Sequence, residues 1–496
     1  MRQDCFTSNQ QEVELKLALL SAPLATLAKR LAQIQALRRH QPSSQLVHNV
    51  YYDTPAQNLR QQSVALRIRR IGGSAKPQWL QTLKTAGRCD SALSQRGEWE
   101  VPVASAKLSL SALKSTPWKT IDLAGKIFPA LAPIFVTSFK RTSWSVPGVD
   151  GSLVEVSLDI GRIVAGPKST PVCELELELM AGRPAVLFDL AHQISRTVAL
   201  MPAGASKSAR GYALINDSLS QPLSASPPKL SGDLSLTAAA GCVLREMLNQ
   251  FTTNLNTLRH SDDPKLVHQA RVGWRRFRSA LRLFKPVLSV ERMPSWEALQ
   301  PLLMTLSELR DIDVARLETL PTLADVYSAG DSQRMDAWQS MMNALLLAGK
   351  QHRRAVKKAL QDPKVGSTLL LAAQWLEELA SLAGPFDQTT KHSEHLQSWA
   401  RHRIAHLHDE LQDASKNSNS SAHRVRIHAK RLRYAVAALQ TLLPRRRAER
   451  WYRKAASLQL SLGAARDLAQ AGVLVARLDV DRGLAEFLRG FAIGKA

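Results

Sequence analysis

Hydrophobic and polar residues alternate along much of the first 212 residues, in short runs that end at Gly or Pro. The runs include EVELK from Glu12, SVALRIRRIGG, QWLQTLKTAG, RGEWEVP, SLVEVSLDIG and CELELELMAG. A period of two is typical of β-strands, whose successive side chains point to opposite faces. Many such strands separated by turn residues predict an antiparallel sheet or barrel. Two segments, 21–37 and 184–200, have helical patterns instead, and we expect them to flank the sheet.

The pattern changes in the second half of the chain. The segment 216–233 is rich in Pro, Ser and Gly, which predicts a linker. From 234 to about 490, long helical patterns rich in Leu, Ala and Arg replace the strand patterns. A chain of 496 residues is too long for one small core. We therefore expect an α+β multidomain protein with a β-rich domain at 10–215 and an all-α domain at 234–490.

The helical half contains an internal repeat. The pattern HxxRVxxRRxR begins at His268 and returns as HxxRIxxKRxR at His423. A second pattern, LxxxRD, begins at Leu306 and again at Leu462. Two matches at nearly the same separation predict a duplicated helical bundle, with repeats at about 234–385 and 386–490.

Composition narrows the class of partner. The chain has 66 basic and 42 acidic residues, a formal net charge of +24, which favours polyanions. The first residues lack an apolar run, and no apolar stretch reaches about 18 residues, so we expect neither a signal peptide nor a membrane-spanning helix. Four scattered cysteines fit reduced thiols. These features favour a cytoplasmic protein.

Charges of both signs gather on one face of the predicted strands. The acidic residues are Glu12, Glu14, Glu98, Glu100, Glu155, Asp159, Glu174, Glu176 and Glu178, and the basic ones are Lys16, Arg67, Arg69, Lys84, Arg141, Lys207 and Arg210. Guanidinium and ammonium groups bind phosphate oxygens, whereas carboxylates bind Mg²⁺ or Mn²⁺. Together they fit metal-assisted hydrolysis of a polyphosphate. The alternative is an ordinary solvated sheet face with cross-strand ion pairs.

The motifs on these strands resemble those of the CYTH superfamily, the triphosphate tunnel metalloenzymes. EVELK matches the ExExK signature, and YYDTP, ALRIR, RGEWE, CELELEL and SKSARGY follow in the expected order over some 200 residues. The resemblance implies an antiparallel, eight-stranded barrel whose tunnel binds triphosphates with a divalent metal. It assigns substrate binding to Lys16, Arg67, Arg69, Lys84, Arg141 and Lys207, and metal binding to Glu12, Glu14, Asp159, Glu174 and Glu176. Glu14 and Lys16 would also position the attacking water.

A basic stripe follows one face of each repeated helix. At 100° per residue, the first stripe contains His268, Arg271, Arg275, Arg278 and Arg282, and the second contains His423, Arg426, Lys430 and Arg433. Like charges at these spacings repel one another, which favours a polyanion-binding face. A solvated helix face is the alternative. Aromatic residues are sparse along the stripe, so we do not expect nucleic acid.

The duplicated pattern resembles the CHAD domain, a helical module often attached to CYTH domains, over roughly 234–490. The resemblance implies two similar helical bundles that bind inorganic polyphosphate. The second copy departs from the first, since Lys430 replaces Arg275 and Ala469 replaces Asp313.

We therefore expect an inorganic triphosphatase that depends on Mg²⁺, with Mn²⁺ as the alternative metal, and hydrolyses tripolyphosphate to pyrophosphate and phosphate. Its helical half would bind inorganic polyphosphate. The alternatives are a non-catalytic polyphosphate-binding scaffold and a CYTH enzyme that acts on ATP as an adenylate cyclase, or on thiamine triphosphate. The sequence predicts no oligomeric state.

Overall fold

The computed structural model describes residues 11–20, 24–72, 77–88, 92–288, 292–382, 392–416, 422–478 and 481–495. The chain forms two compact units, and each is discontinuous in sequence. The first contains residues up to 221 together with 361–374, and the second contains 222–360 and the residues from 375 onward.

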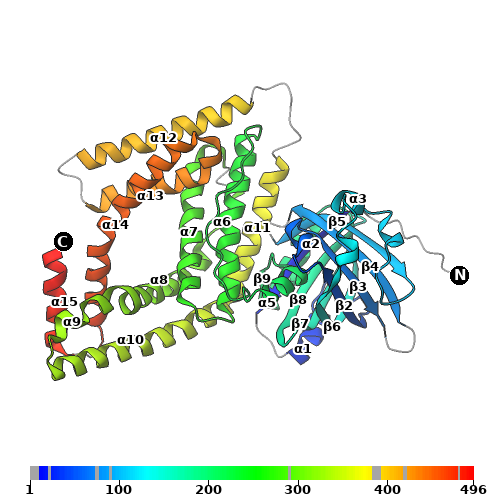
Figure 1. Cartoon of the computed structure of the whole chain (residues 1–496), viewed down its shortest axis with the longest axis horizontal. Helices are drawn as coiled ribbons and strands as arrows, with labels where there is room; N and C mark the ends of the chain where they lie inside the picture. Colours follow the sequence, from blue (N-terminus) through cyan, green and yellow to red (C-terminus); the bar gives the residue numbers. More distant parts are fainter. Residues whose placement is uncertain are drawn as a thin grey trace. The chain divides into compact units, whose positions relative to one another are not determined.

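The first unit is built on a closed antiparallel barrel. Its eight strands are β1 (Gln11–Leu19), β2 (Ser43–Asp53), β3 (Ala65–Ile71), β4 (Gln78–Arg88), β5 (Leu93–Val103), β6 (Ala132–Pro147), β7 (Leu153–Ala165) and β8 (Lys168–Ala181). They lie in the order β5-β4-β3-β2-β6-β7-β8-β1, and β1 also pairs with β5, which closes the barrel (Figure 1). The predicted eight-stranded barrel is confirmed.

The apolar faces of the strands point outward, onto helices. Leu15 and Leu17 of β1 are fully buried in a cluster with Leu31 of α1 (Leu24–Ala32) and Phe188 of α4 (Ala185–Ser195). Burial of this face stabilises the unit by the hydrophobic effect. It also leaves the alternate, charged side chains inside the barrel.

Both flanking helices are shorter than the sequence predicted. α1 ends at Ala32, and α4 ends at Ser195. After α4 the chain enters a short strand, β9 (Leu200–Pro202), which pairs with the end of β1. The segment that ends at Leu200 therefore completes the sheet rather than extending the helix.

A helix from the second half of the chain completes the core of the first unit. The first part of α11 (Pro363–Leu382) belongs to this unit, where Leu370 joins the cluster of Leu17 and Leu200. Gly366 lies so close that a Cβ there would meet the Leu200 carbonyl oxygen at 1.7 Å. The domain boundaries predicted from the sequence, at 215 and 234, place all of α11 in the helical domain, so they miss its contribution to the first unit.

The second unit is helical in the residues described. Its main helices are α6 (Leu236–Leu258), α7 (Pro264–Leu283), α8 (Gln300–Val314), α10 (Ser332–Ala359), the end of α11, α12 (His392–Lys416), α13 (Ala422–Leu439), α14 (Arg445–Val475) and α15 (Arg482–Lys495). The two copies of the HxxR pattern lie on α7 and α13, and the two copies of LxxxRD lie on α8 and α14. α7 packs on α13, and α8 packs on α14, so equivalent parts of the repeat meet. The predicted all-α, duplicated organisation is confirmed.

The segment 216–233 has no helix or strand, but it is not a free tether. From Pro222 onward it belongs to the helical unit. The Asn254 side chain bonds both the N–H and the carbonyl of Leu223 at 3.0 Å, and Arg276 Nη2 donates to the Ser226 carbonyl at 2.9 Å. Since Asn254 and Arg276 are buried, these bonds satisfy polar groups that would otherwise be costly.

Candidate functional site

The barrel encloses a cavity of about 1030 Å³. All eight strands and the start of α5 (Lys207–Ile215) contribute side chains to its wall. Glu12, Glu14, Lys16 and Arg67 are each less than one tenth exposed. The charged strand faces therefore surround an internal cavity, which excludes the alternative of an ordinary solvated sheet face.

Most of the residues that the sequence singled out meet in this cavity. Glu12, Glu14, Lys16, Arg67, Arg69, Lys84, Arg141, Glu176 and Lys207 line it. Asp159 and Glu174 lie behind the wall, where both accept bonds from Lys207. The strand positions predicted for Lys207 and Arg210 are wrong, since both residues lie on α5. Ser206 caps this helix, and Lys207 on its first turn reaches the wall carboxylates.

Six of the carboxylates form two groups of three. Within each group the carboxylates lie close enough together to bind one metal ion. One contains Glu12, Glu98 and Glu178, the other Asp159, Glu174 and Glu176, and within each group the oxygens lie within 4.8 Å of one another. Glu14 belongs to neither, because it pairs with Lys16 and with Arg96 Nη2 at 2.8 Å. The sequence could not divide its carboxylates in this way, since the division depends on strand register.

The second group is already neutralised by protein cations. Lys207 Nζ lies 2.6 Å from Asp159 Oδ2, 2.5 Å from Glu174 Oε1 and 3.0 Å from Glu176 Oε1. Arg141 Nη2 adds bonds to Asp159 at 2.7 Å and to Glu176 at 2.6 Å. Burial lowers the pKa of Lys207, but the three carboxylates outweigh it and raise that pKa well above its ordinary value.

The first group keeps one carboxyl without a cation. Lys84 lies 2.7 Å from Glu12 and 3.0 Å from Glu98, whereas no ion pair forms at Glu178 among the described residues. Burial and the neighbouring Glu12 raise the pKa of Glu178 to about 8. A divalent cation would relieve this uncompensated negative charge, so the donor set fits a hard metal.

Cations continue along the rest of the wall. Arg67 lies 3.4 Å from Glu98 and also contacts the Tyr51 hydroxyl at 3.4 Å. Arg69 Nε donates to the buried Asn49 at 3.0 Å, which fixes its guanidinium. Burial and the neighbouring Arg67 lower the pKa of Arg69, although Arg69 also pairs with Glu100 at 3.3 Å. An anion with several phosphates would satisfy these donors.

Arg96 is a site residue that the sequence analysis did not assign. It lines the cavity and bonds both Glu12 and Glu14 at 2.8 Å. Its position in RGEWE, two residues before Glu98 and on the same strand face, was the available signal.

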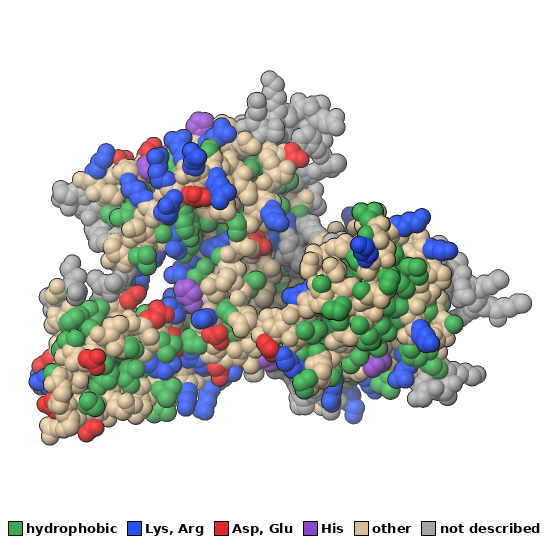
Figure 2. Space-filling model, in the orientation of Figure 1, with side chains coloured by type: hydrophobic (Ala, Val, Ile, Leu, Met, Phe, Trp, Pro, Cys, Tyr) green, Lys and Arg blue, Asp and Glu red, His purple; other side chains and the backbone are tan. Residues whose placement is uncertain are grey.

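In the helical unit, cations from both repeats form one group, which we call the basic cluster. It contains Arg271 and Arg275 of α7, Arg310 of α8, Arg426 and Lys430 of α13, and Arg466 of α14. Burial lowers the pKa of Lys430 to about 8, with further contributions from Arg426, Arg275 and Arg466. Burial and the neighbouring Arg275 likewise lower the pKa of Arg271 to about 10. These shifts require the cations to lie close together, and Figure 2 shows Lys and Arg side chains around the hollow between these helices.

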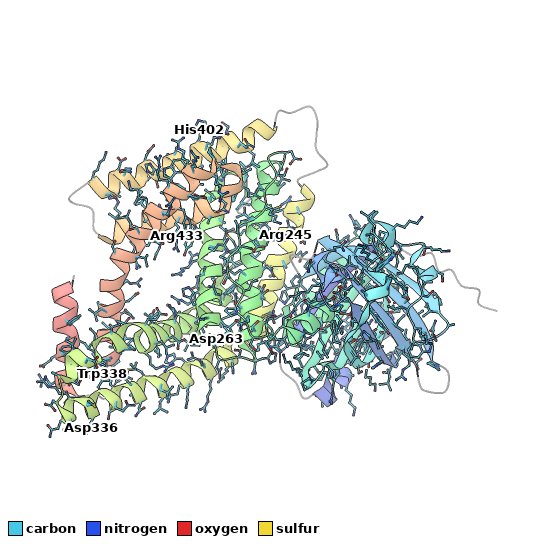
Figure 3. All side chains as sticks on the ribbon, viewed as in Figure 1. Arg245, Asp263, Asp336, Trp338, His402 and Arg433 are labelled. Carbon is cyan, nitrogen blue, oxygen red and sulfur yellow. The ribbon has the colours of Figure 1, made fainter. Side chains whose placement is uncertain are left out.

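Of the remaining stripe residues, Arg278 and Arg282 separate from the cluster, whereas His268 and Arg433 lie beside it. Burial, then Arg278 and Arg431, lower the pKa of Arg282, so these three form another group near the end of α7. Arg433, labelled in Figure 3, lies over the Tyr434 ring at 5.1 Å. Burial and the neighbouring Arg310 lower the pKa of His268 to about 4, so it is neutral at pH 7. The side chain of His423 lies outside the described residues.

The basic cluster also contains acidic groups. Asp311 of α8 accepts a bond from Gln470 of α14 at 3.5 Å, and Arg310 pairs with Glu318 at 3.0 Å. Arg310 and Arg466 belong to the repeated LxxxRD pattern, but that pattern does not predict that they lie beside the α7 and α13 stripes.

Comparison with known families agrees with this architecture. The CYTH domain model matches residues 10–212, and the CHAD domain model matches residues 242–476. The chain therefore contains a CYTH domain followed by a CHAD domain, as the motifs indicated.

Individual relatives match parts of the chain. It is 34% identical over 204 residues to the inorganic triphosphatase of Haemophilus influenzae, a match that covers 41% of this chain and 55% of that protein. The chain thus matches about half the length of this curated relative. A crystal structure of the CHAD domain from Ricinus communis is 26% identical with a TM-score of 0.47, and covers 55% of this chain and 91% of its own. A putative adenylyl cyclase from Hippeastrum, described as having a dominant triphosphatase activity, is 22% identical with a TM-score of 0.31, and covers 41% of this chain and 95% of its own.

Within the described residues, no helix combines the length and the apolar character that a bilayer crossing requires.

Proposed function

We propose that the barrel is a metal-dependent triphosphatase that hydrolyses inorganic tripolyphosphate to pyrophosphate and phosphate. The observation that carries this proposal is the wall of the internal cavity, where a row of cations faces a carboxylate group whose Glu178 has no cation partner among the described residues. The similarity to an inorganic triphosphatase supports the same reaction class.

The cations would hold the triphosphate. The cations that line the cavity offer donors from four strands and one helix, so they can bind several phosphates at once: Lys16, Arg67, Arg69, Lys84, Arg141 and Lys207. Arg96 adds a donor beside Glu12 and Glu14. Because these side chains are fixed by buried ion pairs, the phosphates would bind to donors that need little reorganisation.

The carboxylates would hold Mg²⁺ or Mn²⁺, which when bound supplies charge neutralisation and a more acidic water. Of the predicted ligands, Glu12 lies with Glu98 and Glu178 in the group that fits a metal better. Asp159, Glu174 and Glu176 already bind Lys207. Glu14 and Lys16 lie between the two groups. Lys16 contacts Glu14 and also Glu176 of the second group, and Glu14 lies opposite Glu178 of the first group. This position suits the pair to orient the attacking water.

The cavity lining favours an inorganic substrate over a nucleotide. Among the described residues of the cavity wall, the aromatic ones are Tyr51 and Phe139, and Tyr51 is buried and stacked on Phe135. Phe139 lies beneath Arg141 and Lys207. Neither ring is free to stack on a base, which the alternatives with ATP or thiamine triphosphate would favour.

A substrate panel tests this proposal. Phosphate release with Mg²⁺ should be fastest on tripolyphosphate and slower on ATP and thiamine triphosphate. Formation of cyclic AMP from ATP without turnover of tripolyphosphate would overturn it in favour of an adenylate cyclase.

We further propose that the basic cluster binds inorganic polyphosphate. The basic cluster brings six cations from four helices together. Burial, and then neighbouring cations, lower the pKa of Arg271, Arg426 and Lys430, so a polyanion would relieve the repulsion in the cluster. Salt-sensitive binding of long-chain polyphosphate tests this point, and no binding at low salt would reject it. The four scattered cysteines fit a reducing compartment, so we place the protein in the cytoplasm.

A further inference from the structure

A second basic surface lies at the start of α14, away from the basic cluster in sequence. Among residues 445–454, six are cations and one, Glu449, is an acid. Arg446, Arg450 and Arg453 line a surface hollow of about 480 Å³ together with Glu449. We call these three arginines the α14 patch. Figure 2 shows Lys and Arg side chains gathered over the part of the unit where α12, α13 and α14 meet.

The charge of the α14 patch is poorly compensated. Glu449 lies 2.9 Å from Arg445 and 4.0 Å from Arg453. Within the described part of the chain, neither Arg446 nor Arg450 has an ion-pair partner. The arginine side chains are solvated, as the 79% exposure of Arg453 shows. The six cations at 445–454 therefore leave a net positive charge, because Glu449 alone cannot balance them.

This arrangement opposes helix stability. Arg446 and Arg450 are four residues apart, and Arg450 and Arg453 are three apart, so the charges of each pair repel one another on the helix surface. Arg446 also lies in the first turn of the helix, where the macrodipole is positive and disfavours a cation. The apolar side of the helix is anchored by buried Ala448, Trp451 and Ala455, which need no arginines opposite them. An anion on the exposed side would relieve both unfavourable terms.

We propose that the α14 patch is a second contact surface for long-chain polyphosphate, separate from the basic cluster. This inference rests on the proposed polyphosphate binding of the helical unit. The three arginines extend over about 10 Å of helix axis, so a flexible chain of phosphates can contact all of them. Arg453 and Arg466 of the basic cluster are about 20 Å apart along α14, so a molecule as short as tripolyphosphate cannot contact both. A long chain bound at one surface would meet the other at a high effective concentration.

The patch fits polyphosphate better than nucleic acid. One aromatic side chain, Tyr452, is exposed beside the arginines, whereas Trp451 is buried beneath Arg447 at 4.8 Å. Single-stranded nucleic acid binds on several aromatic platforms that take successive bases. The patch offers phosphate donors without such platforms.

The test compares two triple variants of the full chain. The first variant replaces the three arginines of the α14 patch: Arg446→Gln, Arg450→Gln and Arg453→Gln. It should weaken binding of long-chain polyphosphate and reduce the magnitude of the slope of log affinity against log salt concentration by about 2. Lys350→Gln, Arg354→Gln and Lys358→Gln on the exposed face of α10 remove the same charge and serve as the matched control. This control should leave the slope unchanged, and both variants should hydrolyse tripolyphosphate like the wild type.

The outcomes separate this inference from the proposed function. If the wild type binds no long-chain polyphosphate, the proposed role of the helical unit fails as well. If the wild type binds but the α14 variant keeps the full slope, or both variants lose it equally, the α14 patch is rejected alone. A single-stranded RNA that competes as well as polyphosphate at equal charge would also overturn it.

Discussion

Arg96 Nε lies 2.8 Å from Glu12 Oε2, across the seam where β5 pairs with β1 and closes the barrel. The same guanidinium reaches Glu14 at 2.8 Å, so one side chain holds two carboxylates of the ExExK run. On its other side Arg96 lies opposite Gly87 of β4, where a Cβ would meet the Arg96 Cβ at 2.4 Å, so this position has no room for a larger side chain.

Replacing Arg96 by Ala should therefore affect both stability and activity. Loss of one partner leaves two buried carboxylates under-compensated, which costs about 3 kcal/mol. We expect a lower midpoint in urea unfolding and slower phosphate release from tripolyphosphate. Arg96→Lys is the control, since it restores the charge but not the two-pronged contact, and it should recover part of the stability. An unchanged unfolding midpoint in Arg96→Ala would contradict this role.

The pKa of Glu178 predicts a pH-dependent affinity for metal. Its folded pKa of about 8 lies above the ordinary value of 4.5, so the folded protein keeps a proton there that the unfolded chain loses. Without metal, this group therefore lowers stability as pH rises from 4.5 toward 8. A metal ion must displace that proton, so Mg²⁺ should bind more tightly as the pH approaches 8.

Thermal shift with and without Mg²⁺ measures this effect. The stabilisation by metal should grow as pH rises, and Glu178→Gln should remove the growth. Glu155→Gln is a matched control, because Glu155 lines the same cavity but belongs to neither carboxylate group. A pH-independent shift in the wild type would count against the assignment.

The contact between α11 and β9 makes a prediction about stability. Gly366→Val places a side chain against the Leu200 backbone, and overpacking of this kind costs about 1–3 kcal/mol. We expect a clear fall in the thermal unfolding midpoint. Gly490→Ala in α15 is the control, since a Cβ there meets nothing within 4 Å and alanine favours a helix. Equal thermal unfolding midpoints for the two variants would show that α11 does not complete the core.

Within the helical unit, the stripe residues should differ in importance. Arg271→Ala and Arg275→Ala, each made singly, remove one member of the basic cluster and should each weaken polyphosphate binding at moderate salt. Arg278→Ala should have a smaller effect, because Arg278 lies in the separate group with Arg282 and Arg431. Fluorescence anisotropy with long-chain polyphosphate gives the comparison. Equal losses for all three positions would favour one continuous stripe, as the sequence suggested.

Much of the fold and the cavity followed from local patterns. The period-two alternation of Glu12, Glu14 and Lys16 defines which side chains share a face, and the helix-spaced arginines define a stripe. Partners across the barrel depend on register instead. Glu12 meets Arg96 because β1 pairs with β5 at that point, and Glu14 lies opposite Glu178 through the pairing with β8.

The sequence also does not predict that the first part of α11 belongs to the first unit. Its apolar residues, such as Leu370, have the same spacing in any amphipathic helix, so the pattern cannot say which core they join. The grouping of Arg310 and Arg466 with the two stripes depends on how four helices meet. Such tertiary contacts are not encoded in a helical period.

The most direct test of the account is phosphate release from tripolyphosphate in the presence of Mg²⁺ by the wild type, Glu14→Ala and Lys16→Ala. Because both side chains lie at the centre of the charged cavity, we expect the wild type to turn over and each variant to lose activity by on the order of 10²-fold or more while remaining folded by circular dichroism. A wild type without turnover, or folded variants with full activity, would contradict the assignment of the tunnel as the catalytic site.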